Sequence, residues 1–90
     1  MPIGKKIVIE KIKGYLNNTI PKQEIYKWAS SIVMSPEFDN LDKSNKLLSD
    51  AIQAMFELHH EDGKFDPKRE EFEEYLKALE FDDLLDAGNQ

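Results

Sequence analysis

The segment IPKQEIYKWASSIVM, residues Ile20 to Met34, decides the fold class. Apolar side chains recur along it at i, i+3, i+4 and i+7, which places them on one face of a helix. Pro21 suits the first helical turn, because the N–H that proline lacks would have no helical partner there. The pattern predicts an amphipathic helix over residues 21–34 with Trp28 as a core anchor, and a ligand-stacking role for Trp28 is the alternative. The apolar positions are Ile25, Trp28, Ala29 and Ile32.

The segment before it, residues 5–17, has a similar spacing and predicts another helix. The β-branched run from Ile7 to Ile9 would also suit a strand, so this alternative stays open. Gly14 makes the helix less stable by about 1 kcal/mol relative to alanine. The apolar positions of the helix are Val8, Ile12, Tyr15 and Leu16.

Two further helices are predicted after residue 40. Residues 42–60 have apolar side chains over much of the helical circumference, so this helix should contact neighbours on several sides and form the centre. Residues 67–80 return to one apolar stripe with glutamates around it. The stretch from Ser35 to Asn40 is predicted to be a short helical turn or a loop. The apolar positions are Leu47, Leu48, Ala51, Ile52, Ala54, Met55, Phe56 and Leu58 in the first helix and Phe72, Tyr75, Leu76 and Leu79 in the second.

The last ten residues, FDDLLDAGNQ, place apolar side chains at Phe81, Leu84 and Leu85 with aspartates between them. One interpretation is a last turn that folds back over the core. The other is a short acidic-hydrophobic docking motif for a groove of a partner protein. The whole chain is therefore predicted to be one all-α domain over residues 1–90. Its fold would be a compact bundle of four helices (5–17, 21–34, 42–60 and 67–80) with a short C-terminal helical turn.

Composition excludes several classes of protein. A chain of 90 residues has room for one core, and without cysteine it has no disulfide and no thiolate metal ligand. No apolar run approaches the roughly 18 residues of a membrane span. The N-terminal residues lack the apolar centre of a signal peptide. We therefore expect a cytoplasmic protein that does not bind membranes.

The charge is unevenly distributed along the chain. Residues 1–36 have a net charge of +4 and residues 37–90 a net charge of −10, which together give −6. A net negative charge repels nucleic acid, and Arg69 is the only arginine available for reading phosphates or bases. We therefore predict that the chain does not bind DNA or RNA. The charged segments are either solvated helix faces or, in the acidic half, a surface that docks on a basic partner.

The stretch HHEDGKFDPKRE, residues His59 to Glu70, combines the residue types of a metal site and of a helix–turn–helix connection. Gly63 suits the end of one helix, and Asp66 with Pro67 suits the start of the next. A calcium loop centred on Gly63 fails, because its first and twelfth positions would be Leu58 and Arg69. Adjacent histidines diverge by about 100° on a helix, so His59 and His60 do not form a zinc pair. We predict a connection without a metal site, and weak metal binding or pH sensing by the histidines stays open.

No catalytic motif is recognisable, and we predict neither catalytic residues nor a cofactor. The glutamates of the last helix lack the apolar surroundings that shift the pKa of an acid–base catalyst. The predicted function is protein–protein interaction through the acidic half of the chain. The candidate partner-binding residues are Glu70, Glu71, Glu73, Glu74, Asp82 and Asp83.

The pattern G-Y-L-x-x-x-I-x-x-x-E-x-x-x-W-A from Gly14 to Ala29, with the later F-x-x-Y-L from Phe72 to Leu76, resembles a group of small uncharacterised bacterial helical proteins. The resemblance covers roughly residues 12–80 and implies a fold, because its motifs are core positions. In size, acidity and helix number the chain is also similar to the immunity proteins of nuclease colicins, but it lacks their adjacent tyrosines. The alternatives are therefore an immunity or antitoxin-like protein that neutralises a basic toxin, a small metal-binding protein or hydrolase, and a self-associating structural domain.

Overall fold

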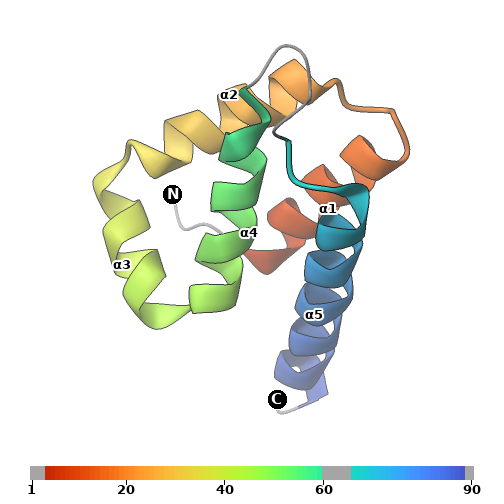
Figure 1. Ribbon diagram of the computed structural model, residues 1–90. Helices are drawn as coiled ribbons and strands as arrows, with labels where there is room; N and C mark the ends of the chain where they lie inside the picture. Colours follow the sequence, from red (N-terminus) through yellow and green to blue (C-terminus); the bar gives the residue numbers. More distant parts are fainter. Residues whose placement is uncertain (1–3, 60–65, 89–90) are drawn as a thin grey trace.

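The computed structural model describes residues 4–59 and 66–88 of the chain (Figure 1). No strand occurs among these residues, which confirms the all-α prediction. The elements are α1 Lys5–Leu16, α2 Lys22–Val33, α3 Pro36–Ser44, α4 Lys46–Phe56, the 3₁₀ turn Glu57–His59 and α5 Arg69–Gly88.

The central position belongs to α4, as its wide apolar circumference predicts. This helix packs against each of the other four helices, and they surround it from different directions (Figure 1). A helix with neighbours on several sides needs apolar or small residues around most of its surface. Its buried residues meet that requirement: Leu48, Ser49, Ala51, Ile52, Ala54 and Met55.

The core is one cluster to which every helix contributes. Trp28 contacts this cluster as predicted but lies half-buried at its edge, where the ammonium of Lys11 is 5.6 Å from the ring centroid. Such cation–π contacts stabilise by about 0.5–1 kcal/mol at exposed sites. The buried apolar side chains are Val8, Ile9, Ile12, Ile25, Ala29, Phe38, Leu48, Ala51, Ile52, Ala54, Met55, Leu58, Phe72 and Leu79.

The end of α1 explains why a glycine is present in a helix. The side chain of Ile20 occupies the space that a Cβ atom at Gly14 would need, with Ile20 Cβ 3.2 Å from that position. The N–H groups of Thr19 and Ile20 donate to the carbonyl oxygen of Gly14 at 2.9 and 3.0 Å. Asn18 makes the reversal with a φ of 61°, a value that asparagine tolerates. Gly14 therefore lowers helix propensity but permits the close return of the chain toward α2.

The predicted helix over residues 42–60 is divided differently in the structure. α3 already begins at Pro36, with Ser35 before it, and buries Phe38. The chain bends at Asn45, where φ is −147° and ψ is 87°, and the side chain of Asn45 accepts a hydrogen bond from the N–H of Leu48 at 3.2 Å. This N-cap supports a fresh start of α4, so the bend lies inside the predicted range. Residues 36–40, predicted to be a short helical turn or a loop, are thus part of a full helix.

The first residue of α5, Arg69, contacts the C-terminal end of α1. The guanidinium of Arg69 donates a hydrogen bond to the carbonyl oxygen of Leu16 and lies 6.0 Å from the ring centroid of Tyr15. The rings of Tyr15 and Phe72 then meet edge to face, with centroids 5.2 Å apart. A cation at the carboxyl end of a helix also complements the helix dipole. The single arginine therefore connects two helices of the fold.

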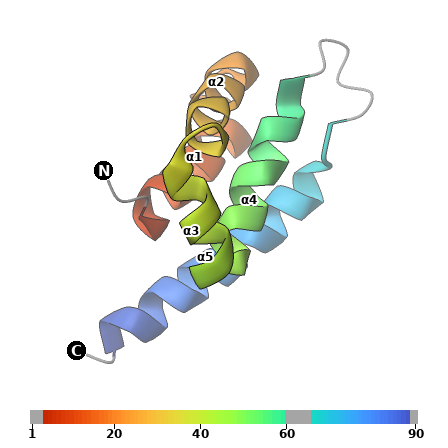
Figure 2. The same ribbon diagram turned by 90° about the vertical axis from the view of Figure 1, so that its left-hand side faces the viewer.

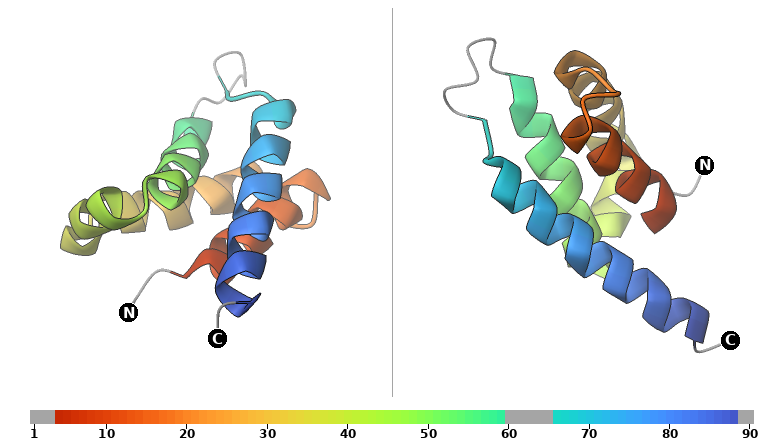
Figure 3. Two further views of the ribbon diagram at one scale, coloured as in Figure 1. Left: turned by 90° about the horizontal axis from the view of Figure 1, so that it is seen from below. Right: turned by 90° about the vertical axis from the view of Figure 1, so that its right-hand side faces the viewer.

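The sequence predicts that the last long helix ends near residue 80. In the structure α5 has 20 residues and ends at Gly88. The predicted separate C-terminal turn is the last part of this helix. Among the described helices α5 packs only against α1 and α4. Its last turns extend beyond the other helices (Figure 2 and Figure 3). From Arg69 to Ala87 it contains neither proline nor glycine, so no residue interrupts the helical hydrogen bonds.

Two phenylalanines of α5 provide a matched test of this arrangement. Phe72 is fully buried, so Phe72→Ala should lower the free energy of unfolding by about 3–5 kcal/mol in urea titration. Phe81 is exposed, so Phe81→Ala should change it by less than about 0.5 kcal/mol. Similar losses in the two variants would contradict the position of α5.

Candidate interaction surface on α5

The structure places all six candidate partner-binding residues on α5, but in two different settings. Four glutamates lie exposed in the first half of the helix, and two aspartates lie half-buried in its second half. Among the described residues none of the four glutamates forms an ion pair. The glutamates are Glu70, Glu71, Glu73 and Glu74, and the aspartates are Asp82 and Asp83.

Two of these glutamates border a shallow hollow between α4 and α5, here called the acidic hollow. Its volume is about 320 Å³, and its floor is apolar. Burial raises the pKa of Tyr75 above its ordinary value of 10.0, and the negative charges of Asp50, Glu71 and Glu74 raise it further. The three carboxylates therefore produce a negative potential at the phenol. The residues that line the acidic hollow are Leu47, Glu71, Glu74, Tyr75 and Ala78.

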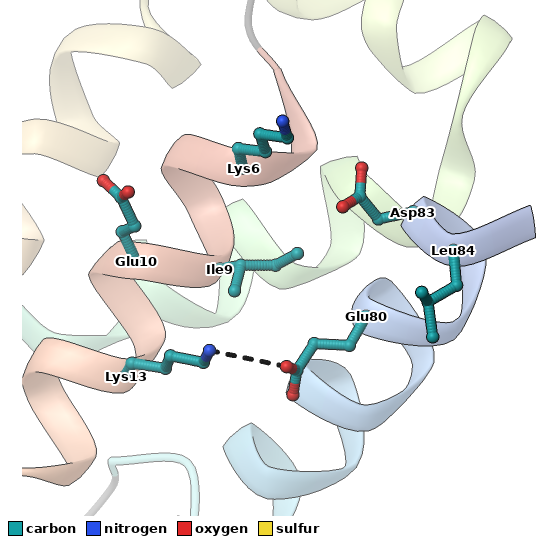
Figure 4. Close-up of a pocket in the computed structure, with 7 residues that line it drawn as sticks. All are labelled: Lys6, Ile9, Glu10, Lys13, Glu80, Asp83 and Leu84. Atoms are coloured by element: carbon teal, nitrogen blue, oxygen red, sulfur yellow. Dashed lines mark ion pairs between the residues drawn. The ribbon is translucent and has the colours of Figure 1, made fainter. Parts of the chain in front are cut away.

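A second hollow, the α1–α5 groove, lies on another side of the helix (Figure 4). The ammonium of Lys13 and the carboxylate of Glu80 close one end of it at a distance of 3.4 Å, and Ile9 points between the two helices (Figure 4). Its volume is about 330 Å³, and its rim carries charges of both signs. This mixture makes it a weaker candidate for a basic partner. The lining residues are Lys6, Ile9, Glu10, Lys13, Glu80, Asp83 and Leu84.

Lysines of the basic N-terminal part neutralise several carboxylates of the acidic part inside the fold. Lys5 lies 2.8 Å from Asp82, and the lysine is largely buried. Lys22 lies 2.5 Å from Asp66, which joins the segment before α5 to α2. Asp82 thus has a structural partner, whereas Asp83 borders the α1–α5 groove without an ion pair to any described residue. Free negative charge is concentrated on the first half of α5.

The second half of α5 leaves large apolar side chains in water. Phe81 is 63% exposed, Leu84 70% and Leu85 50%. The predicted folding of these residues back over the core is therefore wrong. Single exposed apolar residues are common on protein surfaces, but a group of three on neighbouring turns is the more informative observation. These three residues are here called the apolar end of α5.

The opening of the predicted His59–Glu70 connection lies largely outside the described residues, including His60 and Gly63. Asp66 does not begin α5, which starts at Arg69. Across residues 4–59 and 66–88, no three histidine or carboxylate side chains gather closely enough to hold a metal ion. None of the helices in the described ranges is both long and apolar enough to cross a membrane.

No family model matches the chain, and searches of curated proteins and of solved structures give no significant match. The resemblance to small bacterial helical proteins therefore stays a prediction. Geometry, burial and charge are the observations that bear on function.

The setting of Tyr75 predicts a pH effect. Its pKa is higher in the folded chain than in the unfolded chain, so the stabilisation is complete below pH 10.0 and is lost as the pH rises through the folded pKa. Phenolate absorbance should show a phase above pH 10.0 that Tyr75→Phe removes. Replacing Glu71 and Glu74 by glutamine should move that phase to lower pH. A phase that persists in Tyr75→Phe would contradict the assignment.

The two aspartates allow a comparison at equal change of charge. Asp82→Asn removes the ion pair with Lys5 and should lower the free energy of unfolding by about 0.5–1 kcal/mol. Asp83→Asn should change it by less than about 0.3 kcal/mol, because no described residue pairs with Asp83. Urea titration of both variants, repeated in a Lys5→Met background, measures the difference. An Asp82 effect that persists without Lys5 would contradict the role of the pair.

Proposed function

We propose that this chain is a protein-interaction module that binds a basic partner protein through α5. The observation that carries the proposal is the combination of free carboxylates and exposed apolar side chains on one helix that extends beyond the core. Solvated helix faces commonly carry glutamates, but solvation does not favour exposed phenylalanine and leucine.

The two halves of α5 contribute in different ways. The exposed glutamates attract a basic surface at long range and increase the rate of encounter, an effect that falls as ionic strength rises. The apolar end supplies short-range stabilisation, because covering apolar surface stabilises by about 25 cal/mol per Å². Phenylalanine is also enriched at the centres of interfaces, which have polar rims.

The proposal predicts a charge-dependent partner. The purified chain and a variant with lysine at positions 70, 71, 73 and 74 would be used as bait in the same native extract. We expect one or a few basic proteins to be retained by the wild type and to fall by at least about tenfold on the variant. Binding should then be reproduced with the purified partner.

The control is a variant with the same change of net charge on another part of the fold. It carries lysine at four exposed acidic positions: Glu24 of α2, Glu37 and Asp39 of α3, and Glu57. It should retain the partner. Retention of the same proteins by the α5 variant, or loss in the control alone, would reject the proposal.

A further inference from the structure

One line of residues connects the two halves of the proposed surface. Glu71, Glu74, Ala78, Phe81 and Leu85 recur with alternating spacings of three and four residues. Residues spaced in this way lie along one side of an α-helix and form the contact line of paired helices. We call these five residues the α5 stripe; at about 1.5 Å per residue it is about 21 Å long.

The structure confirms that the first part of this line shares one side of α5. Glu71, Glu74 and Ala78 all border the acidic hollow, together with Leu47 of α4. Burial is the largest cause of the raised pKa of Tyr75, and the negative charges of Asp50, Glu71 and Glu74 raise it further. The electrostatic potential in the hollow is therefore negative. Lys46 lies 3.2 Å from Asp50 at the exposed surface of α4, which leaves the two glutamates as the free carboxylates of the hollow.

The second part of the line changes from charged to apolar. Phe81 and Leu85 continue it at the next two positions, and both are exposed. Glu73 lies off the line, about 100° around the helix from Glu74, whereas Glu70 and Leu84 flank the line, four residues before Glu74 and three after Phe81. The α5 stripe is therefore acidic at one end and apolar at the other.

We propose that the α5 stripe binds a single helix of a partner protein, with lysines or arginines of that helix at Glu71 and Glu74 and its leucine-type side chains on Ala78, Phe81 and Leu85. This inference rests on the proposed interaction function and specifies its partner. A long basic side chain matches the acidic hollow, because its aliphatic stem covers apolar atoms while its charge meets the carboxylates. Charge complementarity sets the register of the two helices.

A second copy of this chain, paired over the full length of the stripe, does not complement it. In an antiparallel pair centred on Ala78, Glu74 would face Phe81 of the second copy and Glu71 would face Leu85. In a parallel pair each glutamate would face its own counterpart, and like charges in direct opposition destabilise a helix pair. The stripe thus fits a different protein, one whose helix is basic at one end.

The test uses synthetic helical peptides as probes. One face of the peptide carries lysines in one half and leucines in the other, at spacings of three and four. It is made in both directions, and the tighter binder is used; a peptide of the same composition in scrambled order is the control. Fluorescence anisotropy measures the dissociation constant. The measurement is made at physiological salt, where attraction between exposed charges is screened beyond about 8 Å, so that contacts at the stripe determine the affinity.

Matched pairs of variants separate the stripe from the rest of the helix. Glu71→Gln with Glu74→Gln should weaken binding at least about fivefold, and Glu70→Gln with Glu73→Gln less than about twofold. Phe81→Ala with Leu85→Ala should weaken it at least about tenfold, and Leu84→Ala less than about threefold. Amide chemical shifts should change along Glu71, Glu74, Ala78, Phe81 and Leu85.

Equal losses in the two glutamate pairs, equal binding of the scrambled peptide, or no binding of either direction would overturn the inference. Self-association in sedimentation that Phe81→Ala with Leu85→Ala abolishes would also overturn it, in favour of a second copy. None of these results rejects the proposed function, provided that the four-lysine variant still fails to retain the partner that the wild type captures. Loss of that charge effect would instead reject the proposed function itself.

Discussion

The packing of α1 and α4 on one side of α5, together with the greater length of α5, is the constraint on which the surface depends. α5 has 20 residues and α1 has 12, so at about 1.5 Å per residue they are about 30 and 18 Å long. The two helices run in opposite directions, with Leu16 at Arg69 and Lys5 at Asp82. α1 therefore begins beside Asp82, and α5 continues beyond this point to Gly88. In this part of the chain Phe81, Leu84 and Leu85 are each at least half exposed.

The pairing of α1 with α5 also redistributes charge. In the sequence a basic segment is followed by an acidic one, which suggests a protein with two oppositely charged faces. In the fold, lysines of α1 and α2 meet carboxylates of the acidic segment at Asp82, Glu80 and Asp66. Partly exposed pairs of this kind contribute little stability individually, but they remove charge from the surface. The negative potential that remains is stronger on the first half of α5 than the sequence alone indicates.

Sequence patterns predicted the part of the fold that depends on local periodicity. The all-α class, the central position of α4 and most buried positions follow from the spacing of apolar residues, as Ile25, Ala29 and Ile52 illustrate. The bend at Asn45 was missed, because an asparagine inside an apolar pattern gives only a weak signal for a new N-cap. Pro36 and the apolar Phe38 were the available signals for α3.

The candidate site was predictable in composition but not in geometry. The six acidic candidates were identified from the sequence, but periodicity cannot tell a covered face from an uncovered one. Phe72 and Phe81 are nine residues apart and so lie on opposite sides of α5; α1 and α4 pack on the side of Phe72 and leave Phe81 exposed. The acidic hollow was missed for the same reason, because Leu47 approaches Glu71 and Glu74 only after α4 and α5 pack.

The exposed end of α5 requires an explanation other than folding. Alanine, lysine or glutamate at positions 81, 84 and 85 would keep the helix about as stable. These residues are strong helix formers, and the side chains that they would replace are at least half exposed. Phenylalanine and leucine there instead add apolar surface that favours association. In the proposed complex a partner would cover this surface, and the adjacent glutamates would favour a partner of complementary charge. The same residues that the fold does not need are thus the ones that would give an interface both its affinity and its selectivity.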